Sequence, residues 1–264
     1  SKSVQVFYNT HLVSLFDERE LDRVRLVELD RNHKTVIKKP WTNKIEEIVA
    51  PVYHALGIDK LIFEKAQKIL FVEGISDKFY LEGLQAADKL SKEWYIHPIS
   101  GGNKLENNDL INRIEMLSCL SKHKEINYCF VLDGDRRNIV QSNLEINKVI
   151  FLGNESQELE DLFDKDFYLN SVIECYRDIF VDDKNKLKKL EKVIKKIWKN
   201  STSATSKITK RIDDEFKNVG IGGFSKVDVA IHIKRKLKKR EFKDKDVSDI
   251  VRKLKGGLKD LSTN

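Results

Sequence analysis

The stretch KILFVEGISDKFYLEGL, residues 68–84, decides the fold class of this chain. It opens with four consecutive apolar residues, 69–72, as expected of a strand that is buried on both faces. A helical pattern follows at once, and we predict a helix over residues 77–90. Two acids occupy the junction, because Glu73 ends the strand and Asp77 opens the helix. A strand that leads directly into a helix is typical of α/β proteins.

The same order of elements continues after this stretch. Apolar segments predict further strands at residues 94–100, 127–133 and 148–153, and helices are predicted over 108–121 and 155–164. Buried strands that alternate with helices indicate a parallel sheet flanked by helices. We therefore expect a Rossmann-like α/β domain in the middle of the chain.

The two ends of the chain differ from this middle part. Alternating patterns predict short strands at residues 4–8, 23–29 and 35–39. After residue 180 the strands stop, and lysine-rich helices are predicted over residues 184–200, 226–242 and 247–258. We expect the last helix to end at its Gly-Gly pair. The first of these helices has one apolar stripe, made of Leu187, Leu190, Ile194 and Ile197.

The composition is that of a folded, basic protein. The 264 residues carry a formal net charge of +7, and 40% of them are hydrophobic, which is enough for a buried core. A basic balance fits a polyanionic partner such as nucleic acid or an anionic membrane surface. It fits an ordinary lysine-rich surface equally well.

Several features concern the cellular compartment. No apolar run approaches the roughly 18 residues of a membrane span, and no signal peptide opens the chain. Cys119, Cys129 and Cys175 contain no CxxC pair, and Cys119 and Cys129 lie within apolar patterns, which predicts buried free thiols in a reducing compartment. We expect a cytoplasmic protein with no membrane partner. Because the sequence begins at Ser1 with a strand-like segment, we also expect a piece of a longer protein.

Acids follow two of the predicted strands at the point where each strand ends. Glu73 and Asp77 follow the first strand, and Asp133 and Asp135 end the stretch CFVLDGD, residues 129–135. Ligands of open α/β sheets bind outside the carboxyl ends of the strands, so these carboxylates should converge. Their mutual repulsion calls for a cation, and oxygen ligands suit Mg²⁺. Each motif alone also fits turn chemistry, with Asp77 as a helix cap.

These residues resemble a known family. VEGISD (72–77) followed by LDGD (132–135) is similar to the Toprim signature, a Glu in one motif and Asp-x-Asp in the next. Toprim domains occur in primases, type IA and type II topoisomerases, recombination proteins and the OLD (overcoming lysogenization defect) nucleases. The resemblance covers about residues 67–165. It implies that Glu73, Asp77, Asp133 and Asp135 bind catalytic Mg²⁺ or Mn²⁺.

Two further motifs resemble the OLD nucleases in particular. NESQELEDLF (154–163) is similar to the motif in which an acid opens a helix; Glu160 matches that acid, and Glu158 is the second candidate. FSKVDVA (224–230) is similar to the lysine-x-x-x-alanine start of a helix, which implies that Lys226 faces the metal site. A solvated helix face and a solvated lysine are the alternatives.

The beginning of the chain resembles an ABC-type ATPase. QVFYNTHLVSLFD (5–17) is similar to the last strand and H-loop of that domain, where His11 would contact the γ-phosphate. The segment 23–37 is similar to the strands that follow, and an ordinary hairpin explains it as well. The chain contains no G-x-x-x-x-G-K-[ST] motif, so we expect ATP to bind only in the full-length protein.

These resemblances divide the chain into four segments. Residues 1–40 would be the end of the ABC-type ATPase domain, 41–66 a helical linker, 67–180 the Toprim catalytic domain and 181–264 a lysine-rich helical subdomain that completes the site.

The resemblance implies a metal-dependent DNA endonuclease. Two cations about 3.5 to 4 Å apart would activate a water and stabilise the leaving oxygen. Glu73, Asp77, Asp133, Asp135 and Glu160 would hold them, and Lys226 would offset developing charge. Contacts with DNA are expected from Lys104, Arg136 and Arg137. A homodimer, a helicase partner, and a role in phage defence or DNA processing belong to the same expectation.

Two other hypotheses about the function fit the same residues. A Toprim topoisomerase or primase-like enzyme would use the same acids, although no zinc-ribbon cysteine set is present. A non-catalytic DNA-binding or dimerisation module would carry the acids as structural groups.

Overall fold

The fold was derived from a computed structural model that describes residues 26–29, 34–38, 68–99, 106–123, 126–144, 147–199 and 207–260. His11, Lys104 and the predicted linker at 41–66 lie outside these residues. The chain divides into two compact units, Ser1–Gln67 with Met116–Ile126 and Lys68–Glu115 with Asn127–Asn264.

The described part of the first unit contains a two-stranded sheet. Strand β1 (Leu26–Leu29) pairs antiparallel with β2 (Thr35–Lys38), so that Leu26 lies opposite Lys38 and Leu29 opposite Thr35. The alternation of side chains in these segments predicted both strands, and the prediction is confirmed for these residues. The strand predicted at residues 4–8 lies outside the described part of the chain.

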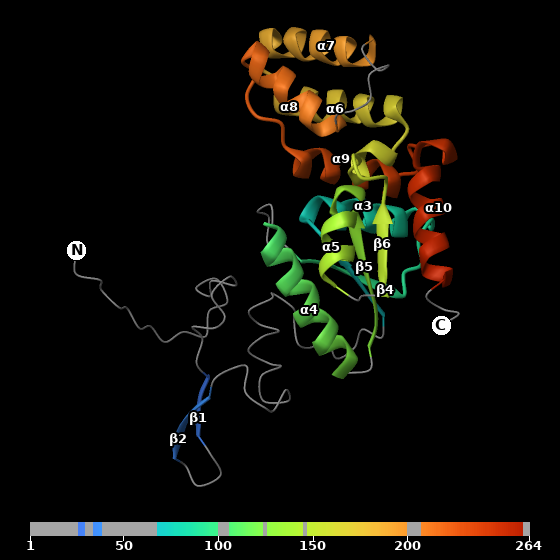
Figure 1. Ribbon diagram of the computed structural model, residues 1–264. Helices are drawn as coiled ribbons and strands as arrows, with labels where there is room; N and C mark the ends of the chain where they lie inside the picture. The colour runs from blue at the N-terminus through green and yellow to red at the C-terminus, as the bar shows by residue number, and fades with distance from the viewer. Residues whose placement is uncertain are drawn as a thin grey trace, which may run out of the picture. The chain divides into compact units, whose positions relative to one another are not determined.

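The second unit is built on a four-stranded parallel sheet (Figure 1). Its order is β4 (Trp94–Pro98), β3 (Lys68–Val72), β5 (Asn127–Asp133) and β6 (Val149–Leu152). All three neighbouring pairs are parallel, which confirms the predicted α/β class. After β3, the chain forms β4 on one side of β3, and β5 later pairs with the other side of β3. The order of strands therefore reverses between β3 and β5, where ligands of such sheets bind.

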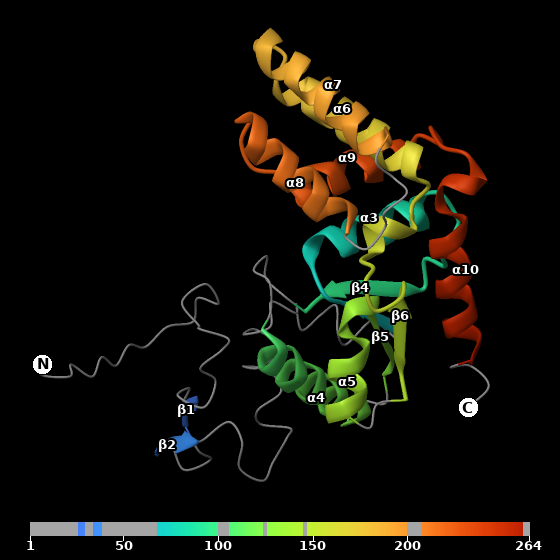
Figure 2. The ribbon, with the colours of Figure 1, turned by 45° about the horizontal axis from the view of Figure 1, so that its top comes forward.

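Helices cover both faces of this sheet (Figure 2). Ile150 and Phe151 point to opposite faces because they are successive residues of β6. Ile150 contacts Gly257 of α10 (Asp244–Asp260), whereas Phe151 lies under the Arg137 guanidinium at the start of α5 (Arg137–Asn143). Helix α4 (Asn107–His123) lies between β4 and β5 in the sequence.

Helix α3 (Ile75–Ala86) lies on the α10 side and carries α9 (Lys226–Lys238) on its outer surface. Gly83 permits this close approach, because a Cβ there would lie 2.9 Å from Leu237 Cδ1 and 3.1 Å from Lys234 Cα. At the far ends of the two helices, Arg240 hydrogen-bonds to Asp88. The two helices therefore run side by side in the same direction, and their N-termini meet at the same end of the sheet.

The rest of the unit is helical. Helices α6 (Lys165–Ile179), α7 (Lys184–Lys199) and α8 (Ile208–Val219) share one hydrophobic core with α3, α9, α10 and the sheet. Leu190, Ile194 and Ile197 are buried, as the predicted stripe of α7 requires, and Leu187 is half-buried. Cys129 is a buried free thiol, as predicted, and so is Cys175. The side chain of Cys119 lies outside the described part of the chain. None of the described helices is long and apolar enough to cross a membrane.

Two predictions about helix boundaries were wrong. The helix predicted over 155–164 is only a short 3₁₀ turn, η4 (Leu159–Leu162), since Phe163 leaves it in an extended conformation. Helix α10 does not stop at the Gly-Gly pair but continues to Asp260. Gly257 has a packing role instead, because a Cβ there would lie 2.5 Å from Ile150 Cγ1. Helices α6 and α8 were not anticipated at all.

The Gly-Gly pair of α10 offers a matched test of this packing. Gly256→Ala adds a methyl group in open space and removes backbone freedom, so it should stabilise the protein by up to about 1 kcal/mol. Gly257→Ala pushes against Ile150 and should be less stable than Gly256→Ala by about 1–3 kcal/mol. Chemical denaturation of both variants measures the difference. Equal stabilisation by the two substitutions would contradict the close packing of α10 on β6.

Candidate functional site

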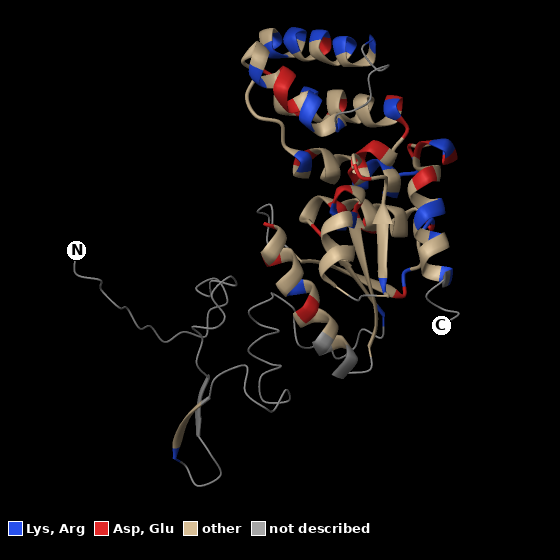
Figure 3. Ribbon diagram, in the orientation of Figure 1, with Lys and Arg blue, Asp and Glu red and all other residues tan. Residues whose placement is uncertain are grey.

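Carboxylates gather at the reversal point between β3 and β5. Val72, the last residue of β3, pairs with Val131 of β5, so Glu73 leaves the sheet beside the end of β5 at Asp133. Acidic side chains from α3 and η4 reach the same place. Figure 3 shows this concentration of acidic residues between the sheet and α9, and basic residues along α7 and α10.

Asp77 stands in the first turn of α3 and points toward this end of the sheet. Its Oδ2 accepts a hydrogen bond from the Gly74 N–H at 2.8 Å, which satisfies one free amide of the helix N-terminus. Helix capping does not account for the whole environment of Asp77, because its side chain is also buried near Glu160 and Glu73. Burial first, and then these two carboxylates, raise the pKa of Asp77 to about 7.

Asp133 connects the end of β5 to η4. Its Oδ1 accepts a hydrogen bond from the Leu159 N–H at 2.9 Å, which fixes the turn that carries Glu160. Desolvation raises the pKa of Asp133 well above its usual value, and the carboxylates of Asp77, Glu160 and Glu73 raise it further. Four predicted site residues therefore lie within electrostatic reach of each other.

Glu160 is the most deeply buried acid of this group, with an exposed fraction of 1%. Among the described residues, neither of its side-chain oxygens has a partner in hydrogen-bonding geometry, although Lys226 Nζ lies 3.2 Å from Oε1. Its pKa is raised by burial, against the attraction of Lys226. Tyr80 and Tyr168 are fully buried, and the charge of Glu160 adds to burial in raising the pKa of both phenols. A carboxylate in such a place is costly unless a cation joins it.

Lys226 faces the acids, as the sequence predicted. Ser225 caps α9 by accepting a hydrogen bond from the Asp228 N–H, and Lys226 follows in the first turn. Its Nζ lies 3.1 Å from Glu158 Oε2 as well as beside Glu160. Burial lowers the pKa of Lys226, but the surrounding carboxylates outweigh it and the net pKa is raised. Lys226 is therefore charged at neutral pH.

Lys207 is the part of the site that the sequence did not identify, and it pairs with Glu158, the second candidate acid of the motif at residues 154–163. Glu158 accepts hydrogen bonds from Lys207 Nζ and Thr209 Oγ1, both at 2.8 Å. Burial raises the pKa of Glu158, but Lys226, Lys207 and Thr209 outweigh it and lower the pKa to about 2. Lys207 Nζ also hydrogen-bonds to Asp135 Oδ2. Nothing distinguishes Lys207 in a sequence with 49 lysines and arginines.

Arg136 has a role different from the predicted DNA contact. Its guanidinium is buried, and its Nη2 lies 2.6 Å from Glu73 Oε1 while its Nε lies 3.1 Å from the same oxygen. Nη1 donates to Asn107 Oδ1 at 2.9 Å. Arg136 therefore holds Glu73 in place and does not face outward. Arg137 lies 4.7 Å from the ring centre of Phe151 and is half-buried.

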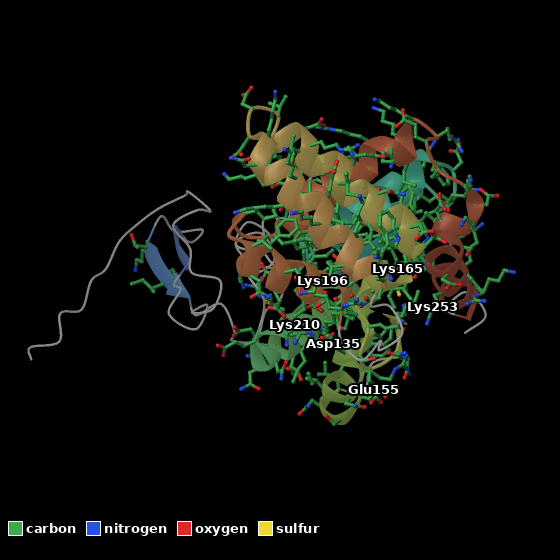
Figure 4. The ribbon with its side chains drawn as sticks, turned by 90° about the horizontal axis from the view of Figure 1, so that it is seen from above. Asp135, Glu155, Lys165, Lys196, Lys210 and Lys253 are labelled. Atoms are coloured by element: carbon green, nitrogen blue, oxygen red, sulfur yellow. The ribbon has the colours of Figure 1, made fainter. Side chains whose placement is uncertain are left out.

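If every acid of the cluster is ionised, its charges do not balance. The acids are Glu73, Asp77, Asp133, Asp135, Glu158 and Glu160, and the described basic groups are Arg136, Lys207 and Lys226. The raised pKa values of Asp77, Asp133 and Glu160 mean that protons relieve part of this excess in the absence of a bound cation. The N-termini of α3 and α9 add only partial positive charge. Figure 4 shows the side chains of the described residues from above, with Asp135 labelled among them.

The donor atoms suit a hard divalent cation. Asp135 Oδ1 and both oxygens of Glu160 are buried and lack a hydrogen-bond partner in the described part of the chain. Carboxylate oxygens without thiol or imidazole partners favour Mg²⁺ or Mn²⁺ over softer metals. Within the described ranges, no three Asp, Glu, His or Cys side chains stand close enough to form a coordination sphere as they lie. Lysine and arginine side chains stand between them instead.

Comparison with known proteins identifies one relative and no activity. No protein-family model matches the chain, and no solved structure matches it. An uncharacterized protein of Methanocaldococcus jannaschii, MJECL43, is 52% identical over 241 residues. These residues are 90% of this chain and 62% of that protein, so the chain spans less than two thirds of its relative. The functional inference therefore depends on the geometry of the site.

The raised pKa of Asp77 predicts how stability depends on pH in the presence of a chelator. The folded protein keeps a proton on Asp77 up to about pH 7, whereas the unfolded chain releases it near pH 4. The folded state therefore binds more protons in this window, and Asp77 makes the protein less stable as the pH rises through it. Asp77→Asn should remove this loss, on the order of 1 kcal/mol for each unit of pKa shift.

Urea denaturation of wild type and Asp77→Asn from pH 4 to pH 8 measures this effect. The two curves of unfolding free energy against pH should diverge in favour of the variant between about pH 4 and pH 7. Parallel curves over the whole range would show that Asp77 does not titrate in this environment.

Proposed function

We propose that this protein is a metal-dependent DNA endonuclease of the OLD type. The observation that carries the proposal is the buried Glu160 carboxylate. Among the described residues its oxygens have no partner in hydrogen-bonding geometry, Lys226 is its ion-pair partner at 3.2 Å, and it lies within electrostatic reach of Asp77 and Asp133 at the carboxyl end of a parallel sheet. An acidic cluster that is short of positive charge and that contains an ordered lysine is what phosphodiester hydrolysis with divalent cations requires.

Each residue of the cluster has a role in this proposal. Asp77, Asp133, Asp135 and Glu160 would hold the cations, with Glu73 held toward them by Arg136. Bound cations would activate the attacking water and stabilise the departing 3′ oxygen. Lys226, charged and fixed by Glu158, would stabilise the negative charge that develops on the scissile phosphate.

The basic surfaces of two helices are the reason to propose DNA as the substrate. Lysines cover the outer face of α7, and Arg235 and Lys238 are exposed in the last turn of α9. Such surfaces bind phosphates without reading the sequence, and their affinity falls with salt. Arg137, which follows the Asp135 motif directly, and Lys104 are further proposed DNA contacts. ATP binding through His11, a homodimer and a helicase partner are proposals for the longer protein.

Asp133→Asn tests the proposal directly. The substitution keeps the shape of the side chain and removes a charge from the centre of the cluster, so cleavage of plasmid DNA should fall to background, a loss of at least about 10³-fold. The assay compares Mg²⁺, Mn²⁺ and Ca²⁺ on supercoiled plasmid. Asp249→Asn, an exposed acid on α10 that pairs with Arg252, is the matched control and should cleave like wild type.

The products of the same assay separate the competing functions. Nicked or linear plasmid supports a nuclease, whereas closed relaxed circles would indicate a topoisomerase. An Asp133→Asn protein that behaves like wild type would contradict the catalytic role of the acids and favour a DNA-binding module.

Lys226→Ala tests the role of the lysine in the cluster. Loss of a fixed cation near the developing charge should lower the rate of cleavage by about 10²–10³-fold. Lys234→Ala, on the same helix but paired with Glu82, should retain the wild-type rate. Single-turnover cleavage at saturating DNA measures the rate, and gel shift in Ca²⁺ measures DNA affinity. A Lys226→Ala defect explained entirely by weaker DNA binding would contradict this role.

A further inference from the structure

The ammonium group of Lys207 joins two parts of the cluster that are far apart in the sequence. It hydrogen-bonds to Asp135, just after β5, and lies 2.8 Å from Oε1 of Glu158, just before η4. The side chains of Asp135, Lys207 and Glu158 are 23%, 22% and 11% exposed, so the contact is largely shielded from water. A single positive charge thus bridges two carboxylates at the edge of the site.

This bridge leaves the hydrogen bonds of Asp135 incomplete. Oδ2 of Asp135 is bonded to Lys207, whereas Oδ1 is buried, lies 4.0 Å from Arg136 Nε and has no hydrogen-bond partner among the described residues. An ammonium group carries one charge and reaches one oxygen of each acid, whereas a divalent cation carries two charges and binds several oxygens. The position between Asp135 and Glu158 therefore suits a divalent cation better than a lysine.

We propose that Lys207 holds the place of a divalent cation between Asp135 and Glu158, and that cation binding displaces its ammonium group. The inference rests on the proposed function, because it takes the acidic cluster to be a site for divalent cations. Lys207 is then a positioning residue that holds the two acids in place in the metal-free protein and lowers the affinity of the site for metal.

The surrounding contacts allow Lys207 to leave without disrupting the site. Glu158 keeps two other partners, Thr209 Oγ1 at 2.8 Å and Lys226 Nζ at 3.1 Å. The backbone next to Lys207 is held separately, since the Ile208 N–H donates to Asp161 Oδ1 at 2.9 Å. Displacement therefore requires only a rotation of the lysine side chain.

Lys226 does not have this freedom. It reaches Glu158 and the buried Glu160 from the first turn of α9, which is packed tightly on α3 through Gly83. Loss of Lys226 would leave Glu160 without a cationic partner among the described residues. When Lys207 leaves, by contrast, the bound metal takes its place at Asp135 and Glu158. Lys207 is thus the cation that metal replaces.

Titration of Mn²⁺ into the metal-free protein tests this inference without any measurement of cleavage. Lys207→Met removes the competing charge, so the variant should bind Mn²⁺ about tenfold more tightly than wild type in isothermal titration calorimetry. Lys207→Arg keeps the charge and should stay within about threefold of wild type. Lys196→Met is the matched control, because Lys196 makes a similar ion pair with Glu215 on the exposed face of α7.

Thermal unfolding provides a second test, which still distinguishes the outcomes if Lys207→Met is less stable than wild type. Without its lysine, Asp135 should destabilise the metal-free protein, and Mn²⁺ should raise the melting temperature of Lys207→Met by more than that of wild type or Lys196→Met. An equal or smaller rise, or equal Mn²⁺ affinity in the titration, overturns the role of Lys207. Wild-type protein that binds Mn²⁺ but cleaves no DNA overturns the nuclease proposal alone.

Discussion

Negative charge buried at the carboxyl end of a parallel sheet is the constraint on which this structure depends. Glu160 is almost fully enclosed and Asp77 is buried, and each raises the pKa of Asp133. Carboxylates in such a place raise the free energy of the folded state unless cations accompany them. Three basic side chains supply part of that charge, and the acceptors that they leave unsatisfied are the reason to infer a divalent cation.

Three features of the fold bring these charges together. Reversal of strand order between β3 and β5 opens the sheet at one point, and the parallel α3 and α9 bring two helix N-termini to it. The hydrogen bond from Leu159 to Asp133 then holds the η4 turn against the end of β5. Side chains of these elements pack into one hydrophobic core, and close packing opposes a movement that would separate the acids.

The sequence predicted the sheet and most of its acids, because both follow from local patterns. Apolar runs that end in Glu73 or Asp133 mark the carboxyl ends of buried strands, and that edge is shared by all strands of a parallel sheet. The partners of those acids were not predictable. Lys207 meets Asp135 across 72 positions, and Arg136 meets Glu73 across 63, through tertiary contacts that no spacing rule encodes. Lysines are also so frequent here that no single one stands out.

Diffraction at the manganese absorption edge, from crystals grown with Mn²⁺, locates any divalent cation at this end of the sheet. A cation held by the acids should give an anomalous peak about 2.0–2.6 Å from carboxylate oxygens of Asp133 and Glu160, the range of hard cation–oxygen bonds. A fully occupied crystal form with no peak at these acids, and with Glu160 still beside Lys226 as its only cation, would contradict a divalent metal site at the end of this sheet.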